Sequence, residues 1–127
     1  MSSPTQRSLE LLRKEGYLAA IVEKFNHYAG PPEMKCQACG KNKIGVRQDL
    51  FGFADIIAIN AQTRVTLVVQ TTSGSNLSAR RHKVLMTGEA LICMAGGWKI
   101  ELHGWAKRKI VRGGTAFRYE VIRERLN

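Results

Sequence analysis

The sequence predicts a single α/β domain, with a central mixed β-sheet flanked by helices, and three observations support this. The chain has 127 residues, 44% of them hydrophobic, which suffices for one core but leaves little for a second. Residues 54–59 and 65–69 are continuous apolar runs of strand length, which is typical of strands covered on both faces. Apolar residues recur at helical spacing before and after these strands. We therefore expect one domain spanning residues 1–127.

The first part of the chain is predicted to form a helix, a strand and a long loop. Ser3 followed by Pro4 is typical of a helix start, so a helix is expected over residues 5–15. Residues 17–23 are apolar almost throughout, and the glycine before them and a β-branched pair within them favour a strand over a continued helix. Residues 24–48 hold glycines, prolines and a CxxC pair, which predicts a long loop or arm.

The last part of the chain is predicted to form one helix and a hairpin. Apolar positions at helical spacing predict a helix over about residues 76–94, ended by a glycine pair. Residues 98–103 and 116–122 alternate loosely and are separated by the basic segment KRKIVRGG. This arrangement favours a C-terminal β-hairpin.

The net charge indicates a polyanionic partner. Twenty lysines and arginines against ten aspartates and glutamates give a formal charge of +10, which favours phosphate contacts. Nucleic acid, DNA before RNA, is the expected partner. We expect no membrane association and a cytoplasmic protein, because no apolar run approaches the roughly 20 residues of a membrane span and the N-terminus lacks a signal-peptide core. Three cysteines cannot all pair within one chain, which favours a reducing compartment.

One carboxylate stands out as a candidate metal ligand. Asp55 is embedded in the apolar run FADIIAI, where an unpaired charge is costly to bury, and the next strand ends in the polar residues Gln70 and Thr72. Hydrolysis of a phosphodiester with Mg²⁺ requires hard oxygen ligands held rigidly in this way. The alternative is a carboxylate that caps a turn or pairs with Arg47 or Arg64.

The segments LELLRKEGYLAAI, GFADIIAI and TLVVQTT together resemble the PD-(D/E)xK nuclease superfamily, most closely the archaeal Holliday junction resolvases and VRR-NUC type nucleases. The resemblance covers roughly residues 8–90 and implies a restriction-endonuclease-like fold. It implies that Glu10 is the helix acid, Asp55 the central metal ligand, Gln70 the second acid and Thr72 the motif lysine. The resemblance implies a phage-like, homodimeric endonuclease that hydrolyses DNA with Mg²⁺ or Mn²⁺ and has a structure-specific, resolvase-like substrate.

Two motif positions depart from this pattern. Gln70 offers a metal only a neutral carbonyl oxygen, and Thr72 cannot replace a lysine ammonium. Asp49 is a candidate for the missing charge, with a turn aspartate as an equal alternative. Glu23 is a reserve acid, although a solvated strand end is the preferred interpretation. The candidates for the missing cation are Arg80, Arg81 and Lys83 in the following helix and Lys43 and Arg47 in the preceding loop. The three helix residues are also predicted nucleic-acid contacts.

The loop TTSGSN lies between the second central strand and the next helix. Hydroxyls such as Ser73 and Ser75, with backbone N–H groups at a helix start, could cradle a phosphate. Capping by Ser75 or Asn76 explains the same residues without a ligand.

The pair Cys36 and Cys39, followed by a glycine, forms half of a zinc-ribbon knuckle. Structural zinc normally has four protein ligands, so the site would be completed by another subunit or by His27, His82, His103 or Cys93. Otherwise the two cysteines are free thiols in an exposed arm.

The C-terminal hairpin is basic and aromatic. Lys107, Arg108, Lys109 and Arg112 lie near tryptophan and tyrosine residues, a combination that suits contact with a nucleic-acid backbone and stacking on bases. The alternative is a solvated hairpin whose aromatic residues pack on the sheet. A metal-dependent DNA nuclease is thus predicted, and the alternatives are a nuclease-fold nucleic-acid-binding protein without catalysis and a zinc-stabilised interaction module.

Overall fold

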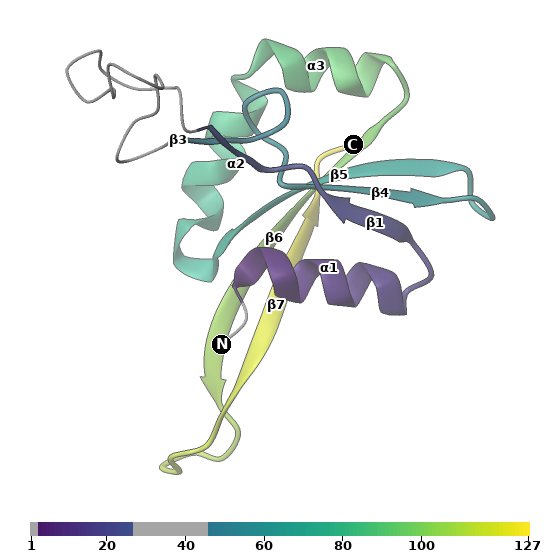
Figure 1. The fold of residues 1–127 in the computed structure, drawn as a ribbon. Coiled ribbons are helices and arrows are strands. Elements are labelled where there is room, and N and C mark those ends of the chain that lie inside the picture. The colour runs from purple at the N-terminus through teal and green to yellow at the C-terminus, as the bar shows by residue number, and fades with distance from the viewer. Residues whose placement is uncertain (1–2, 27–45) are drawn as a thin grey trace, which may run out of the picture.

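The computed structural model describes residues 3–26 and 46–127, and within them the chain forms an α/β fold with a five-stranded mixed sheet (Figure 1). The elements are α1 (Pro4–Lys14), β1 (Leu18–Ile21), β2 (Lys24–Asn26), β3 (Val46–Gln48), β4 (Ile56–Asn60), β5 (Val65–Ser73), η2 (Gly74–Asn76), α2 (Leu77–Leu85), α3 (Gly88–Ala95), β6 (Lys99–Lys109) and β7 (Phe117–Arg125). The predicted α/β class is confirmed.

The sheet has the strand order β1-β4-β5-β6-β7. β1, β4 and β5 are antiparallel neighbours, whereas β5 and β6 are parallel and are connected through α2 and α3. β6 and β7 are antiparallel from Glu101↔Arg125 to Lys109↔Phe117. β2 and β3 form a separate two-stranded sheet. The sheet is therefore mixed, as the sequence predicts.

β5 is the central strand, and both of its faces are buried. Leu67 and Val69 pack with Leu9 and Leu12 of α1 on one face of the sheet. Val68 packs on the other face, in the core that also holds side chains from α2 and α3. The continuous apolar run that predicted a doubly covered strand follows from this arrangement.

The single helix predicted over residues 76–94 is wrong, because the structure has two helices there, preceded by the short 3₁₀-helix η2. The chain leaves helical geometry at Thr87, whose ψ is 124° and whose hydroxyl donates to the carbonyl of Lys83 at 2.8 Å. Gly88 follows, and glycine is a poor residue for a helix interior. The apolar spacing continued across this break, so periodicity alone could not reveal it.

β6 comes unusually close to the segment before α2. A Cβ at Gly104 would lie 3.2 Å from a Leu77 methyl group and 3.3 Å from the Cα of Gly74. A glycine is needed here because β6 and η2 touch almost backbone to backbone. The end of β5 is thereby held tightly against β6.

Within the described residues, no helix is long and apolar enough to span a membrane. The predicted CxxC and most of the predicted arm over 24–48 lie outside the described residues, apart from the paired ends that form β2 and β3.

Candidate metal centre

The candidate site is built around Asp55, which lies immediately before β4 and beside the carboxyl half of β5. Its backbone N–H donates to the Val69 carbonyl at 2.8 Å, and its carbonyl accepts from the Val22 N–H at 2.9 Å. These bonds to two neighbouring segments fix the backbone of Asp55. Its residue surface is only 4% exposed.

Three donors converge on one carboxylate oxygen of Asp55. Oδ2 accepts from the Thr71 backbone N–H at 2.8 Å, from the Thr71 hydroxyl at 3.0 Å and from Nε2 of Gln70 at 3.0 Å. The Thr71 hydroxyl also lies 2.8 Å from the hydroxyl of Thr5 in α1. The position of the carboxylate is therefore set by β5, with α1 behind it.

Two further carboxylates gather at Asp55. One carboxylate oxygen each of Glu23, Asp49 and Asp55 lies within 4.8 Å of the others, which is close enough for all three to hold one metal ion. Among the described residues, neither Asp49 nor Asp55 forms an ion pair with a lysine or arginine. Hard oxygen ligands of this kind suit Mg²⁺ or Mn²⁺.

Burial, together with a hydrogen bond and the negative charge of Asp49, raises the pKa of Asp55 to about 7. The hydrogen bonds from Thr71 act in the opposite direction. Burial and the neighbouring carboxylate of Asp49 therefore disfavour the charged form of Asp55. A bound cation would compensate that charge.

A pocket of about 330 Å³ opens over these carboxylates. Thr5 at the start of α1, Gln70 of β5 and Arg80 of α2 also line it. Asp49 lines both this pocket and a second pocket of about 460 Å³, which Lys83 also lines. Arg80 and Lys83 of α2 therefore lie near the carboxylates, and among the described residues neither forms an ion pair with Asp49 or Asp55.

The structure brings some of the predicted site residues together and separates others. Asp55, Gln70 and Asp49 line one pocket, and Glu23, expected at a solvated strand end, is half-buried beside them. In the described structure Glu10 is exposed on α1 and, like the buried Thr72, does not line this pocket.

Gln70 presents its amide nitrogen to Asp55, and the same nitrogen donates to the Thr71 carbonyl at 3.1 Å. In this arrangement Gln70 orients the carboxylate, and its role as a metal ligand stays a prediction.

The alternatives for Asp55 and Asp49 can also be placed. Arg64 lies in the turn between β4 and β5, at the opposite end of these strands from Asp55. The side chain of Arg47 lies outside the described residues. Asp49 does occupy a turn, since its carbonyl accepts from the Gly52 N–H at 3.1 Å, and its carboxylate reaches the cluster as well.

Sequence reasoning missed Thr71 and Thr5. Thr71 lies between the two predicted motif positions, and both Thr71 and Gln70 donate hydrogen bonds to Asp55. The only signal was the polar run QTT at the end of an apolar strand. Thr5 had no signal, because its role depends on where α1 packs.

The predicted nucleic-acid contacts fall in three places. Ser73 precedes η2 and Ser75 lies within it, with their hydroxyl oxygens 3.2 Å apart, and Asn76, at the N-cap of α2, makes no side-chain capping bond. Arg81 donates two hydrogen bonds to the carboxylate of Glu124, one of them 2.5 Å long from Nε to Oε2. Unlike Arg80, it does not line the acidic pocket. The remaining predicted contacts lie on or next to the β6–β7 pair and are Lys107, Arg108, Lys109 and Arg112.

Cys36, Cys39 and His27 lie outside the described residues, so the predicted zinc site stays a prediction. His103 is fully buried and bonded to Ser8 and Glu101. Cys93 of α3 is half-buried next to an apolar pocket.

That network around His103 is the second buried polar cluster of the fold. His103 Nδ1 lies 2.8 Å from the Ser8 hydroxyl, and Nε2 lies 2.7 Å from Glu101. Arg123 and Arg125 of β7 donate to the two oxygens of Glu101 at 2.5 and 3.1 Å. Ser8 is fully buried and so out of reach of a substrate, and the cluster therefore joins α1, β6 and β7 rather than forming a reactive triad.

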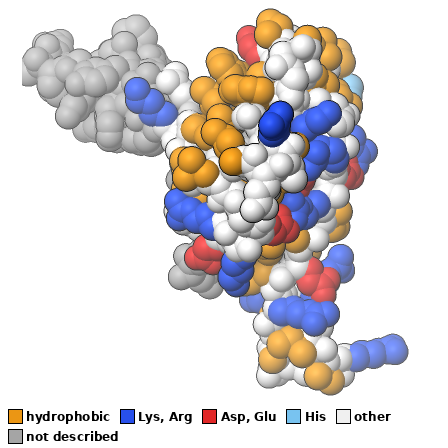
Figure 2. Space-filling view, turned by 90° about the vertical axis from the view of Figure 1, so that its right-hand side faces the viewer, with side chains coloured by type: hydrophobic (Ala, Val, Ile, Leu, Met, Phe, Trp, Pro, Cys, Tyr) orange, Lys and Arg blue, Asp and Glu red, His pale blue; other side chains and the backbone are white. Residues whose placement is uncertain are grey.

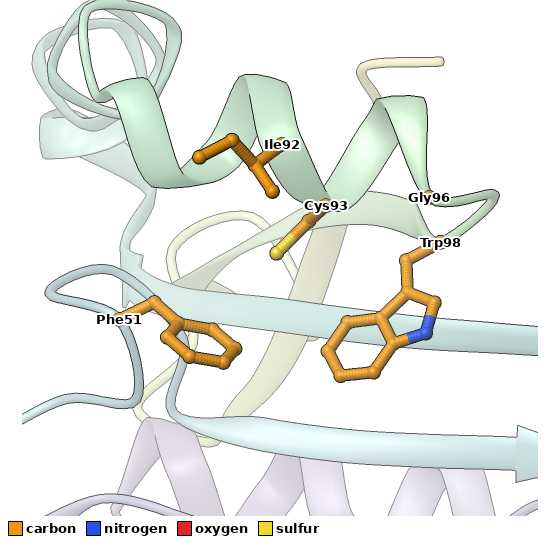
Figure 3. A pocket seen from close by; sticks show the side chains of 5 residues that line it. All are labelled: Phe51, Ile92, Cys93, Gly96 and Trp98. Atoms are coloured by element: carbon orange, nitrogen blue, oxygen red, sulfur yellow. The ribbon is translucent and has the colours of Figure 1, made fainter.

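A small apolar pocket of about 210 Å³ lies on the other side of the sheet (Figure 3). Figure 3 shows Phe51 and Trp98 beneath α3, with Ile92 above them and the sulfur of Cys93 directed between them. The ring centroids of Phe51 and Trp98 are 6.4 Å apart. This pocket lacks the polar groups that phosphodiester chemistry needs.

Comparison of the chain with family models, with curated proteins and with solved structures finds no match.

Proposed function

We propose that this protein is a metal-dependent DNA nuclease that hydrolyses phosphodiester bonds with Mg²⁺ or Mn²⁺. The observation that carries the proposal is the convergence of Glu23, Asp49 and Asp55 within 4.8 Å, beside the end of the central strand. Their oxygens belong to the class of ligand that these cations prefer.

The residues of the pocket fit a divalent cation. Asp55 is held by donors from β5, so its direction does not depend on a metal. Its raised pKa indicates that burial disfavours the ionised form, and a cation would favour that form. A bound metal supplies Lewis-acid activation of a water nucleophile and of the phosphoryl oxygen. Glu23, Asp49 and Asp55 would hold it, while Arg80 at the pocket wall would bind the substrate phosphate.

The arrangement also supports the resemblance to PD-(D/E)xK nucleases. A helix, an edge strand, an Asp-bearing strand and a strand with polar residues at its end follow one another in the expected order, and the strands are neighbours in the sheet. Residues that could replace the two missing motif charges line the same pocket. Asp49 offers the negative charge that Gln70 lacks, and Arg80 offers the positive charge that Thr72 lacks.

DNA is the proposed substrate because the chain carries a charge of +10 and places many of its cations outside the acidic pocket. The homodimer, the branched-DNA preference and the cytoplasmic location implied by the resemblance and composition are part of the same proposal. The zinc site at Cys36 and Cys39 is a separate proposal, tested by metal analysis of the purified protein.

The test is cleavage of labelled duplex, single-stranded and four-way-junction DNA in Mg²⁺ or Mn²⁺. Asp55→Asn keeps the size of the side chain but removes its charge, and the expected result is a loss of cleavage of at least about 100-fold. Glu23→Gln is expected to weaken cleavage strongly, whereas the matched variant Glu10→Gln is not, because Glu10 is exposed outside the pocket. If Glu10→Gln weakened cleavage and Glu23→Gln did not, Glu10 would be the metal-site acid instead of Glu23.

One observation favours a second candidate, a DNA-binding protein without catalysis. The amide nitrogen of Gln70 already donates to Asp55, a position in which the superfamily pattern has an acid that would share the metal. Salt-sensitive DNA binding without cleavage in either metal would establish this candidate and overturn the enzyme proposal.

A further inference from the structure

The last two strands continue beyond the rest of the sheet as a two-stranded ribbon. β6 pairs with β5 only as far as Trp105, whereas its pairing with β7 continues to Lys109↔Phe117. We call the segment from Ala106 to Glu120 the ribbon. Its four residue pairs span about 14 Å at ~3.4 Å per residue, before the turn. Figure 1 shows this segment projecting away from the sheet and from α2 and α3.

The two strands of the ribbon carry positive charge along their length. It contains five lysines and arginines and one acidic residue, Glu120. Arg118 lies 2.8 Å from this carboxylate and Arg108 lies 3.9 Å from it. The remaining cations have no ion pair within the described part of the chain and are Lys107, Lys109 and Arg112.

The end of the ribbon is apolar, although turns of solvated hairpins are normally polar. Ile110 is 54% exposed, Val111 is 65% exposed and Phe117 is 44% exposed. Lys107 lies over the ring of Phe117, with its ammonium 4.5 Å from the ring centroid. Figure 2 shows hydrophobic side chains next to lysines and arginines at this lower end of the molecule. A partner that suits both features presents apolar surface between rows of negative charge.

Duplex DNA presents that combination in its major groove. The groove is about 12 Å wide and about 8.5 Å deep, and it admits a two-stranded β-ribbon. Thymine methyl groups and base edges lie at its floor, between two phosphate backbones. A ribbon about 14 Å long can therefore reach the floor with its apolar turn while its strand cations face the phosphates.

The ribbon is also placed to act together with the acidic pocket. β5 and β6 run parallel, so the ribbon leaves the sheet at the end of β5 that carries Gln70 and Thr71. Thr71 is level with His103, and Lys109 lies six residues further along β6, which corresponds to about 20 Å. One turn of B-DNA is about 34 Å, so a duplex held by the ribbon would extend past the pocket. Arg7 of α1 lies 3.4 Å from the ring centroid of Tyr119 and braces the ribbon against the helix that lines the pocket.

We propose that the ribbon enters the major groove of double-stranded DNA, with Lys107, Lys109 and Arg112 on phosphates and with Ile110 and Val111 against base edges. This inference rests on the proposed function, because it assigns the ribbon to the substrate of the acidic pocket.

The test measures binding to a 30-bp duplex and to single-stranded DNA over a range of salt concentrations. It uses the Asp55→Asn protein without divalent metal, so that cleavage plays no part. The double variant Lys107→Gln/Lys109→Gln is expected to lower the steepness of the salt dependence for duplex by about 2, because each phosphate contact contributes about 0.9. The matched control Lys14→Gln/Arg64→Gln removes the same charge from exposed positions elsewhere and is expected to leave the slope unchanged.

The apolar turn is tested by Ile110→Ser/Val111→Ser. Duplex affinity is expected to fall about tenfold with the salt slope unchanged, because base-edge contacts release no counterions. Methylation protection locates the groove: guanine N7 faces the major groove, and its protection is expected to disappear in this variant. Thermal unfolding confirms that the exposed substitutions leave the fold intact.

Three results would overturn the inference. In the first, the ribbon variants bind duplex as tightly as the parent protein does. In the second, the parent protein protects adenine N3 in the minor groove instead of guanine N7. In the third, the ribbon variants lose binding to anionic phospholipid vesicles while their DNA binding is unchanged. If the unsubstituted protein cuts DNA while the ribbon variants bind normally, only the ribbon inference fails. If the ribbon variants lose duplex binding and no metal supports cutting, only the nuclease proposal fails.

Discussion

Asp55 and Glu101 are two buried carboxylates in adjoining parts of one sheet, and their surroundings are opposite. Each residue is 4% exposed. Val69 connects them, because its carbonyl accepts from the Asp55 N–H and its register partner on β6 is Glu101. Burial raises the pKa of Asp55 to about 7. Burial opposes ionisation of Glu101 too, but the bonds from His103 and Arg123 outweigh it and hold its pKa at about 2.

The difference lies in the neighbouring charges. Two arginines complete the surroundings of Glu101, whereas two carboxylates approach Asp55. A buried carboxylate that already has its cations supports the fold, because it is satisfied without a ligand. One that meets further carboxylates is suited to take a cation from solution. Four predictions test this contrast, in order of decreasing effect.

Removal of Glu101 should destabilise the protein more than any other single change considered. Glu101→Ala leaves His103 and two arginines without their carboxylate, and the expected loss is about 3–5 kcal/mol of unfolding free energy. Urea unfolding at pH 8 without metal measures it. Glu120→Ala is the control, since Glu120 is 43% exposed in its side chain and its ion pairs with arginine are worth about 0–1 kcal/mol.

Asp55→Asn should not destabilise the metal-free protein under the same conditions, because the ionised carboxylate is unfavourable there. A loss equal to that of Glu101→Ala would abolish the contrast between the two sites.

The pH dependence of stability should have opposite signs at the two sites. The pKa of Asp55 rises from 3.8 to about 7 on folding, so its contribution is fully present below about pH 4 and is lost as the pH rises to about 7. The loss is at most about 4 kcal/mol, at ~1.4 kcal/mol per pKa unit. Glu101 contributes fully above pH 4.5 and its contribution is lost as the pH falls to about 2.

The difference in unfolding free energy between wild type and Asp55→Asn, measured in EDTA as a function of pH, isolates the contribution of Asp55 between about pH 4 and 7. Asp49→Asn should move this window to lower pH, because Asp49 raises the pKa of Asp55. A difference that stays flat between pH 4 and 8 would contradict the assigned environment.

Divalent metal should stabilise the protein through Asp55 and not through Glu101. Mn²⁺ at 100 times its Kd is expected to add about 2.7 kcal/mol of unfolding free energy at pH 8. The gain should shrink at pH 5.5, where protonation of Asp55 competes with the metal. Glu101→Gln should retain the gain and Asp55→Asn should lose it, as followed by thermal unfolding with and without EDTA. Equal stabilisation of both variants would indicate binding elsewhere.

Ser8→Ala should have the smallest effect, because the carboxylate–arginine contacts stay in place. It removes the acceptor of the Trp105 indole N–H at 2.8 Å and the partner of His103, so a loss of about 1–3 kcal/mol is expected. Ser78→Ala on the exposed surface of α2 is the control and should change stability by less than about 0.5 kcal/mol. A structural role for Ser8 also requires unchanged Mn²⁺ affinity, measured by titration calorimetry.

The α/β class and the central strand pair followed from local pattern. Leu67 to Val69 read as a doubly covered strand because adjacent positions are both apolar, and the structure packs them on opposite faces of the sheet. The break at Thr87 was not predictable from the same signal, since apolar residues continue at helical spacing on both sides.

The candidate site was predictable only at the residues with a direct chemical signal. Asp55 was visible as a lone acid in an apolar run. Glu23 reaches Asp55 because of how the segment after β1 packs, and Thr5 reaches Thr71 because of where α1 packs on the sheet. Neither arrangement leaves a local pattern in the sequence. The role of Glu101 was not predicted, because its two arginine partners are residues of β7 that strand register brings alongside.

The bonds of Ser8 have a consequence for the order in which the protein takes shape. Its partners His103 and Trp105 are 95 and 97 residues further along the chain. Because α1 precedes β6 in the chain, these bonds can form only after β6 has been synthesised. Thr5 needs only Thr71 of β5, which is made before β6, so this wall of the acidic pocket can form before the cluster around His103 does.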